Sequence, residues 1–417
     1  MDYDQLLKGC GEVGCRLLAG GAEIYRVEDT VKRMLAAYGV KGDVFAIPNT
    51  LIVSLTDENG HDHTRLYRTE SAGGTNIEII EQFNAMSRSV CANPPAPERL
   101  CPMADATQSH CKQYPYPVVL LGYLLGAVFF TLFFRGGLLE ALTAGVAGVL
   151  SGICVMSLDR LKVNFFFKTV AAALALGIVA YVLRALGLPL NIDVTVIGAL
   201  MVLVPGLSFT NFMCDLMTGD ALSGVSTFVR AILTATAIAI GTGVALYLFR
   251  TLGLTVEGVD RTVEYGPWLQ CVISFMACLG FCMFYNVHGG GVALCCLGGA
   301  LGWGVYLLME QVTDSVYICY VAAAIFISAY AEVMARVRKY PITAYLVVSY
   351  FPLVPGSYIY YTMYYSIQGE WQLALDKGVQ AIGLAACLAI GVLLVSTTVR
   401  TFSTWRRERR NRSNGTV

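Results

Sequence analysis

The sequence predicts an α-helical integral membrane protein with about ten transmembrane helices, built as two inverted five-helix repeats with broken helices, plus a small N-terminal cytoplasmic α/β domain. Three observations lead to this fold class. The chain is 56% hydrophobic and 14% charged, whereas about a quarter of the residues in soluble domains are charged. Long apolar segments follow one another from Val118 onward. The run Leu-Val-Pro-Gly lies near the middle of two of them, at 203–206 and at 353–356.

The first part of the chain, residues 1–90, holds most of the polar residues and is expected to form the soluble domain. Apolar residues recur at helical spacing over 4–18 and over 23–38, which predicts two helices. Gly20-Gly21 separates them, because glycine pairs favour turns.

The rest of this domain shows strand and capping signals. Strands are predicted over 43–56 and 63–69, joined by the Asp-Glu-Asn-Gly run at 57–60, which is a strong hairpin signal. Thr75 is expected to cap a last helix of about fifteen residues, in which Glu78 completes a capping box. The predicted order is helix, helix, strand, strand, helix.

Residues 91–117 are rich in proline and are predicted to be a linker. Three cysteines spaced ten residues apart fall here, at Cys91, Cys101 and Cys111. Structural zinc sites use close cysteine pairs, so this spacing does not predict a metal site.

The apolar segments after the linker are long enough to cross a bilayer, which takes about 20 helical residues. The first five form a predicted repeat over 118–250, the last five form a second repeat over 266–398, and 399–417 is a basic tail. The segments are 118–134, 137–157, 165–187, 194–217, 222–249, 266–286, 290–309, 316–335, 342–367 and 372–398.

Basic residues orient these segments. Lysines and arginines gather at 160–168, at 336–339 and in the tail, all on one side of a chain with this number of spans. The positive-inside rule makes that side cytoplasmic. We therefore expect both termini of the chain in the cytoplasm.

An internal repeat relates the two halves of the bundle. Residues 203–232 align without a gap to 353–382, and identities beyond the Leu-Val-Pro-Gly run include Gly219 with Gly369. Each copy covers about five spans, and an odd number of spans means that the second copy inserts upside down. Inverted repeats place a shared binding site near the membrane midplane.

Each Pro-Gly pair, Pro205-Gly206 and Pro355-Gly356, is expected to break its helix. Proline has no backbone N–H to donate, and glycine has little helical preference. Inside a bilayer the loosened backbone is tolerated only where protein or a water-filled cavity covers it. Two breaks in corresponding places therefore predict a transporter site.

Polar side chains follow each break along one helical face. Those after the first break, and then their repeat mates, are Ser208, Asn211, Asp215, Tyr358, Tyr361 and Tyr365. An amide, a carboxylate and several phenols suit a small zwitterion or acid. The alternative is that the tyrosines mark the membrane interface and Asp215 is a solvated helix-end carboxylate. Asn211 and Tyr361 lie deeper and are the stronger candidates.

Arg230 lies about two turns into the fifth predicted span. An intramembrane arginine usually faces the bundle interior and pairs with an anion, here Asp215, Asp220 or a substrate carboxylate. Snorkelling of the guanidinium to the cytoplasmic interface explains the residue equally well. Both interpretations stay open.

Three further titratable residues have weaker signals. Glu140, near the outer end of the second span, is a candidate proton carrier, although an interfacial carboxylate is the simpler interpretation. His61 and His63 follow the predicted hairpin and form at most a weak metal-binding pair.

Several classes of function lack their motifs in this sequence. It has no Walker phosphate loop, dinucleotide fingerprint or zinc-protease helix, so we predict neither an enzyme nor an ATP-driven pump. The net charge of zero argues against nucleic acid as a partner. We expect ion coupling and no cofactor.

Four runs of the sequence resemble the threonine/serine exporter family. Three resemble its N-terminal half: LVPGLSFTNFMCDLMTGDALSGVSTFVRAI (203–232), GAEIYRVEDTVKRM (21–34) and TRLYRTESAGGTNIEII (64–80). The fourth, YFPLVPGSYIYYTMYYSIQGE (350–370), resembles its C-terminal half. The resemblance extends over nearly the whole chain, with both halves fused.

This resemblance implies a secondary transporter that exports threonine and serine and is driven by the proton gradient. It also implies functional roles for Pro205, Gly206, Thr210, Asn211, Asp215, Gly219, Asp220, Arg230, Pro355 and Gly356. Related two-subunit systems export succinate-type dicarboxylates, which is the first alternative. The second is a membrane-anchored sensor or enzyme that acts through the N-terminal domain. The expected partners are a small-molecule substrate and the lipid bilayer, and a homo-oligomer stays open.

Overall fold

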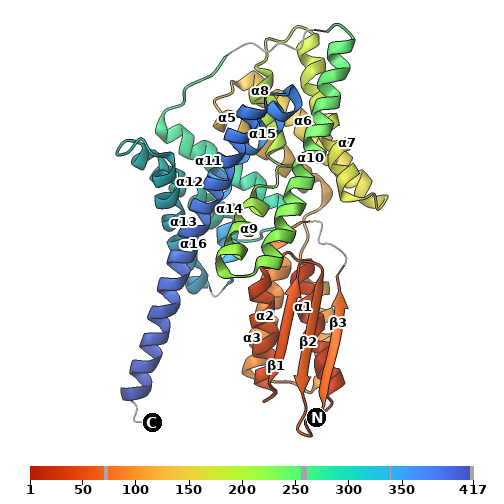
Figure 1. The fold of residues 1–417 in the computed structure, drawn as a ribbon, viewed down its shortest axis with the longest axis vertical. Helices are drawn as coiled ribbons and strands as arrows, with labels where there is room; N and C mark the ends of the chain where they lie inside the picture. The colour runs from red at the N-terminus through yellow and green to blue at the C-terminus, as the bar shows by residue number, and fades with distance from the viewer. Residues whose placement is uncertain (70–73, 255–260, 339, 414–417) are drawn as a thin grey trace.

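The structure is a computed structural model and describes residues 1–69, 74–254, 261–338 and 340–413. A helical bundle occupies one end of the molecule and an α/β domain the other (Figure 1). Within the described residues, eight helices are long and apolar enough to cross a membrane. They are α5 (Tyr116–Phe133), α6 (Leu138–Arg160), α7 (Phe165–Ala185), α10 (Ala221–Thr251), α11 (Pro267–Phe284), α12 (Gly291–Glu310), α13 (Val316–Arg338) and α16 (Trp371–Ser413).

The α/β domain contains a three-stranded antiparallel sheet in the order β1-β2-β3. Its elements are α1 (Tyr3–Ala19), α2 (Ile24–Ala37), β1 (Gly42–Ile47), β2 (Thr50–Thr56), β3 (Asp62–Arg68) and α3 (Ile77–Ala92). Alternate residues of β2, namely Leu51, Val53 and Leu55, are buried, so one face of the sheet packs against α1 and α2.

Two local predictions in this domain are wrong. The strand expected over 43–56 is two strands, because the chain turns at Pro48-Asn49, where proline cannot donate to a sheet ladder. The cap of α3 is Asn76 rather than Thr75, since the Asn76 side chain accepts a hydrogen bond from Ile79 N at 3.2 Å.

The segment predicted as a linker contains a short 3-10 helix, η1 (Pro97–Arg99), and α4 (Leu100–His110). Leu100 and Ala104 are fully buried, and Leu100 lies directly against Gly9 of α1. Much of this segment therefore packs onto the N-terminal domain.

Each Leu-Val-Pro-Gly run lies in a gap between two helices, as the sequence predicts. The first gap separates α8 (Ile192–Leu200) from α9 (Gly206–Thr218). The second separates α14 (Thr343–Ser349) and the short η2 (Phe351–Leu353) from α15 (Gly356–Gln368). Pro205 and Pro355 have nearly the same backbone angles, φ −78° and ψ 47° against φ −74° and ψ 46°.

The order of helices is the same in both halves of the bundle: three long helices, a broken pair and a long helix. The first helices of the halves, α5 and α11, pack against each other. Phe130 and Phe281, which lie at the same position counted from the starts of these two helices, have ring centroids 5.5 Å apart. Contacts between equivalent residues are what a two-fold relation between the halves produces.

The last helix reaches beyond the predicted tenth span. α16 continues without interruption through Ser413, so the described part of the basic tail is helical. Its end lies at the same end of the molecule as the N-terminal domain (Figure 1).

Candidate functional site

The two Pro-Gly breaks meet at the centre of the bundle. A Cβ atom on Gly206 would fall on Cγ1 of Val354, and a Cβ on Gly356 would lie 3.7 Å from Cγ1 of Val204. These contacts are reciprocal, because Val204 and Val354, like Gly206 and Gly356, occupy the same places in the two runs. At Gly206 only glycine allows so close an approach to the other break, whereas a Cβ on Gly356 would first meet Met201, whose Sδ and Cε lie at 2.5 Å.

The helices that follow the breaks leave in opposite directions. α9 runs toward the N-terminal domain and α15 toward the far end of the bundle (Figure 1). Each packs against the final helix of the other half, α9 on α16 and α15 on α10. Ser208, Asn211 and Asp215 therefore lie on the side of the N-terminal domain, and Tyr358 and Tyr361 lie on the other. The structure brings the breaks together but sets the two polar columns end to end.

Asp215 lies in the last turns of α9. Its Oδ2 accepts a hydrogen bond from Ser223 Oγ of α10 at 2.8 Å, and Ser223 is buried. The Asp220 backbone N–H donates to Asp215 O at 2.9 Å, which folds the α9–α10 turn against the carboxylate. Glu23 of the N-terminal domain lies within electrostatic reach. Asp215 therefore lies next to the N-terminal domain.

The remaining residues after the first break differ in exposure. Thr210 is buried, and its hydroxyl donates to Gly206 O at 3.5 Å, so it braces the first turn of α9. Ser208 is half-buried and Asn211 is exposed. The side chain of Asn211 is therefore not packed between helices.

The tyrosines after the second break form a stacked group. Tyr361 stacks on Tyr365 at 5.9 Å and meets the edge of Tyr360 at 5.4 Å. The ammonium nitrogen of Lys377 on α16 lies 5.5 Å from the ring centroid of Tyr358, which is a cation–π contact. A cavity of about 20 Å³ lies beside this group, lined by Tyr181, Thr242, Tyr360, Tyr364 and Gln368 among others. It has room for about one water molecule.

Sequence reasoning missed Ser223 and Tyr360. Ser223 stands eight residues beyond Asp215, and the intervening Gly219 adopts the left-handed conformation (φ 96°) that turns α10 back along α9. A helix-stop glycine between two polar residues is the signal that would have found this pair.

Arg230 is half-buried on α10. Its guanidinium carbon lies 5.6 Å from the ring centroid of Phe165, the first residue of α7. Phe165 directly follows the basic 160–164 connection, so Arg230 is near the bundle end that faces the N-terminal domain.

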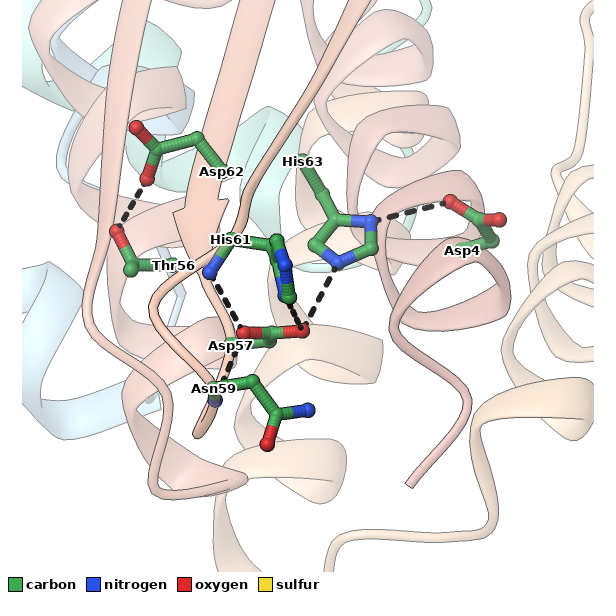
Figure 2. Close-up of polar contacts among 7 residues, drawn as sticks. All are labelled: Asp4, Thr56, Asp57, Asn59, His61, Asp62 and His63. Atoms are coloured by element: carbon green, nitrogen blue, oxygen red, sulfur yellow. Dashed lines mark hydrogen bonds and ion pairs between the residues drawn. The ribbon is translucent and has the colours of Figure 1, made fainter.

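The two histidines of the hairpin surround one carboxylate (Figure 2). His61 Nδ1 and His63 Nε2 each lie 3.5 Å from Asp57 Oδ2, and His63 Nδ1 lies 3.6 Å from Asp4 Oδ1. Backbone N–H groups of His61 and Asn59 donate to Asp57 at 2.8 Å, and these bonds lower the pKa of Asp57 below its ordinary value. Within the described residues no group of three or more His, Cys, Asp or Glu side chains is placed to hold a metal ion. These contacts link the β2–β3 hairpin to the start of α1.

The N-terminal domain is fastened to the bundle through α3. Ile77 N donates to Tyr285 O at 3.0 Å, and Asn286 Nδ2 donates to Asn76 Oδ1 at 3.2 Å. α3 also packs against α14, where Glu81 is buried at 8% exposure. Burial raises the pKa of Glu81 to about 7, with the charge of Glu78 adding to the effect and that of Arg338 opposing it.

This shift predicts a pH-dependent attachment of the domain. The pKa of a free glutamate is about 4.3, so the attached domain holds an extra proton between about pH 4.3 and 7. Attachment is therefore strongest below this window and weakens as the pH rises through it, by about 3 kcal/mol once Glu81 is ionised. Glu81→Gln should raise the thermal unfolding temperature at pH 8 and leave it nearly unchanged at pH 4.

Thermal unfolding of the purified protein between pH 4 and 8 measures this effect. The exposed Glu98 supplies the matched control, since Glu98→Gln should leave the pH profile of the wild type unchanged. A Glu81→Gln variant with the wild-type pH slope would contradict the assignment.

The comparisons with known proteins agree with this architecture. Residues 8–249 match the family model described as putative threonine/serine exporter, and residues 270–398 match a second model described as threonine/serine exporter. The threonine/serine exporter of Corynebacterium glutamicum is 19% identical over 392 residues, which span 92% of this chain and 80% of that protein. Comparison with solved structures gave no match. The chain, an integral membrane protein, therefore belongs to the threonine/serine exporter family.

Proposed function

We propose that this protein is a secondary transporter that exports threonine and serine from the cytoplasm, driven by the proton gradient. The observation that carries the proposal is the reciprocal contact of the two Pro-Gly breaks in a chain of this family. Broken helices expose backbone groups that can hold a polar substrate inside a bilayer. No enzyme chemistry is proposed.

The two broken helix pairs count as two further spans in this proposal, giving ten spans in two inverted five-helix repeats. The repeated helix order and the contact of Phe130 with Phe281 support it. Rocking one repeat against the other about such contacts opens a central site first to one side of the membrane and then to the other. The small cavity beside Tyr360 is consistent with a closed far end.

The proposed roles follow from the positions of the residues. Substrate binds where the breaks meet and contacts the groups nearest to them, which are Pro205, Gly206, Ser208, Thr210, Asn211, Pro355, Gly356, Tyr358 and Tyr361. Asp215 or Asp220 carries the coupling proton on the side of the N-terminal domain. A carboxylate is needed there because it can be protonated and neutral while the site is closed to water, and ionised when the site opens to water.

The proposed location is the bacterial inner membrane, with the N-terminal domain and the end of α16 in the cytoplasm. Basic residues at 160–168 and in the tail support this orientation. The proposed partners are a small-molecule substrate and lipid.

Transport by the purified full-length protein in proteoliposomes tests the proposal. Labelled threonine, serine and succinate are compared in counterflow and in efflux, each with and without a pH gradient. Threonine and serine counterflow together with gradient-stimulated efflux is the expected result. Absence of transport for all three substrates, combined with ligand binding by the protein, would instead favour a sensor.

A dicarboxylate exporter of the same fold is the second candidate, because Arg230 offers a half-buried guanidinium within the bundle. A substrate with two carboxylates needs such a group, whereas an amino acid is already neutral overall. If the substrate is a dicarboxylate, Arg230→Gln should abolish succinate counterflow. If it is threonine, the same variant should keep at least half of wild-type threonine counterflow.

A further inference from the structure

At each end of the bundle, a loop after the first helix of one half is held by a tyrosine from the other half. We call each loop together with its tyrosine a hook. The loop after α5 and the loop after α11 each turn through a residue with positive φ, Arg135 at 65° and Asn286 at 58°. Each loop is then held by a tyrosine that precedes the first helix of the other half. Tyr265 donates to Gly136 O at 2.7 Å and Tyr114 donates to Val287 O at 2.9 Å. The two hooks lie at opposite ends of the bundle.

The two hooks differ in the further contacts that hold them in place. At the end near the N-terminal domain, Asn286 binds Asn76 of that domain and donates to Lys112 O at 2.7 Å. The far end has no attached domain among the described residues. There a carboxylate, Glu140 of α6, is buried at 5% exposure.

Glu140 ties three segments together. Its Oε1 accepts a hydrogen bond from Asn191 N at 3.1 Å. Asn191 caps α8 by accepting from Val194 N at 3.2 Å, and its side-chain amide donates to Arg261 O at 3.1 Å. Glu140 therefore links the start of α6, the start of α8 and the hook segment that carries Tyr265.

Glu140 lies where two helices begin. It lies in the first turn of α6 and faces the start of α8, and both helix dipoles favour an anion there. Within the described residues no basic side chain lies within ion-pair distance of it. The charged and titratable groups on the neighbouring elements are Arg135, Arg184, Asp193, Arg261, Glu264 and Tyr265.

We propose that Glu140 takes up the proton at the bundle end opposite the N-terminal domain and acts as a positioning residue for the broken helix. This inference rests on the proposed proton coupling. A proton from the outer solution adds to the carboxylate, which becomes neutral. A neutral carboxyl accepts a weaker hydrogen bond than a carboxylate does, so the bond from Asn191 N weakens. The start of α8 is then released from α6.

Release at this point reaches the centre of the bundle directly. α8 runs for nine residues from Ile192 to Leu200, about 13 Å at ~1.5 Å per residue. It then leads into the Leu-Val-Pro-Gly run, where Gly206 faces Val354 of the second run: a Cβ on Gly206 would fall on Val354 Cγ1. A proton bound at the far end thus loosens the contact at which substrate is proposed to bind.

Two variants of Glu140 separate its titration from its structural bond. Glu140→Gln keeps an oxygen that accepts from Asn191 N but cannot take up a proton, whereas Glu140→Ala loses both properties. In proteoliposomes, Glu140→Gln should retain threonine counterflow within twofold of wild type. Its gradient-driven efflux should fall at least tenfold below that of the wild type. The dependence of its efflux on external pH should also disappear. Glu140→Ala should lose both activities.

Glu310→Gln is the matched control, because Glu310 is an exposed carboxylate at the end of α12. It should keep the wild-type pH profile. A Glu140→Gln variant whose efflux follows external pH as the wild type does would overturn the role of Glu140 alone. A wild-type protein that exchanges threonine but ignores the pH gradient would overturn proton coupling and this role together.

Discussion

Asp215→Asn should reduce gradient-driven threonine efflux to the level of empty liposomes while leaving threonine counterflow measurable. In the wild type, Ser223 Oγ lies 2.8 Å from Asp215 Oδ2. The asparagine side chain still accepts a hydrogen bond from Ser223, so the α9–α10 turn keeps its shape. It cannot exchange a proton, and the coupled step therefore has no carrier on this side of the membrane. Efflux and counterflow, measured in one preparation of proteoliposomes, separate the two effects.

The controls for this prediction come from the same chain. Asp314→Asn removes an exposed carboxylate between α12 and α13 and should leave efflux unchanged. Ser223→Ala should shift the pH dependence of efflux without abolishing it, because it removes a donor that stabilises the ionised carboxylate. Full gradient-driven efflux by Asp215→Asn would exclude Asp215 as the carrier and leave Asp220.

Local sequence signals predicted the parts of the fold that depend on backbone chemistry. The breaks at Pro205 and Pro355 follow from a missing N–H donor inside an apolar helix. The missed turn at Pro48-Asn49 lies within a continuous strand-like run, where two adjacent residues gave too weak a signal. Helix α4 was missed because flanking prolines and few apolar residues outweighed Leu100 and Ala104, whose burial depends on contact with α1.

The sequence names the candidate site residues but not how they are arranged. Helical spacing shows that Ser208, Asn211 and Asp215 share a face, and says nothing about what that face meets. An inverted repeat makes α9 and α15 run in opposite directions, so the end-to-end placement of the two columns could have been derived from the predicted span count. The contact between Gly206 and Val354 could not, because it joins residues far apart in the chain and depends on packing.

That contact supports a second prediction of large effect. Gly206→Ala places a methyl group on Val354 Cγ1, and overpacking of this kind costs about 1–3 kcal/mol. Val354→Ala removes the obstructing methyl groups and on its own costs about 1 kcal/mol through the space that it leaves. The double variant Gly206→Ala/Val354→Ala should therefore lose less stability than the two single variants lose together. The difference, which is the coupling free energy, should be about 1–2 kcal/mol.

Thermal unfolding and threonine counterflow of the four proteins in this cycle measure the coupling. Gly304→Ala in α12 is the control. Outside its own helix turn and among the described residues, its added Cβ would meet Cys271 Sγ at 3.6 Å, an ordinary contact, and alanine is favoured over glycine inside a helix. Gly206→Ala should lose counterflow and the double variant should recover part of it, because the two breaks must slide past each other as the repeats rock. Additive costs in stability and activity would mean that the breaks do not touch in the transporting protein, and the central site would have to be sought along α9 alone.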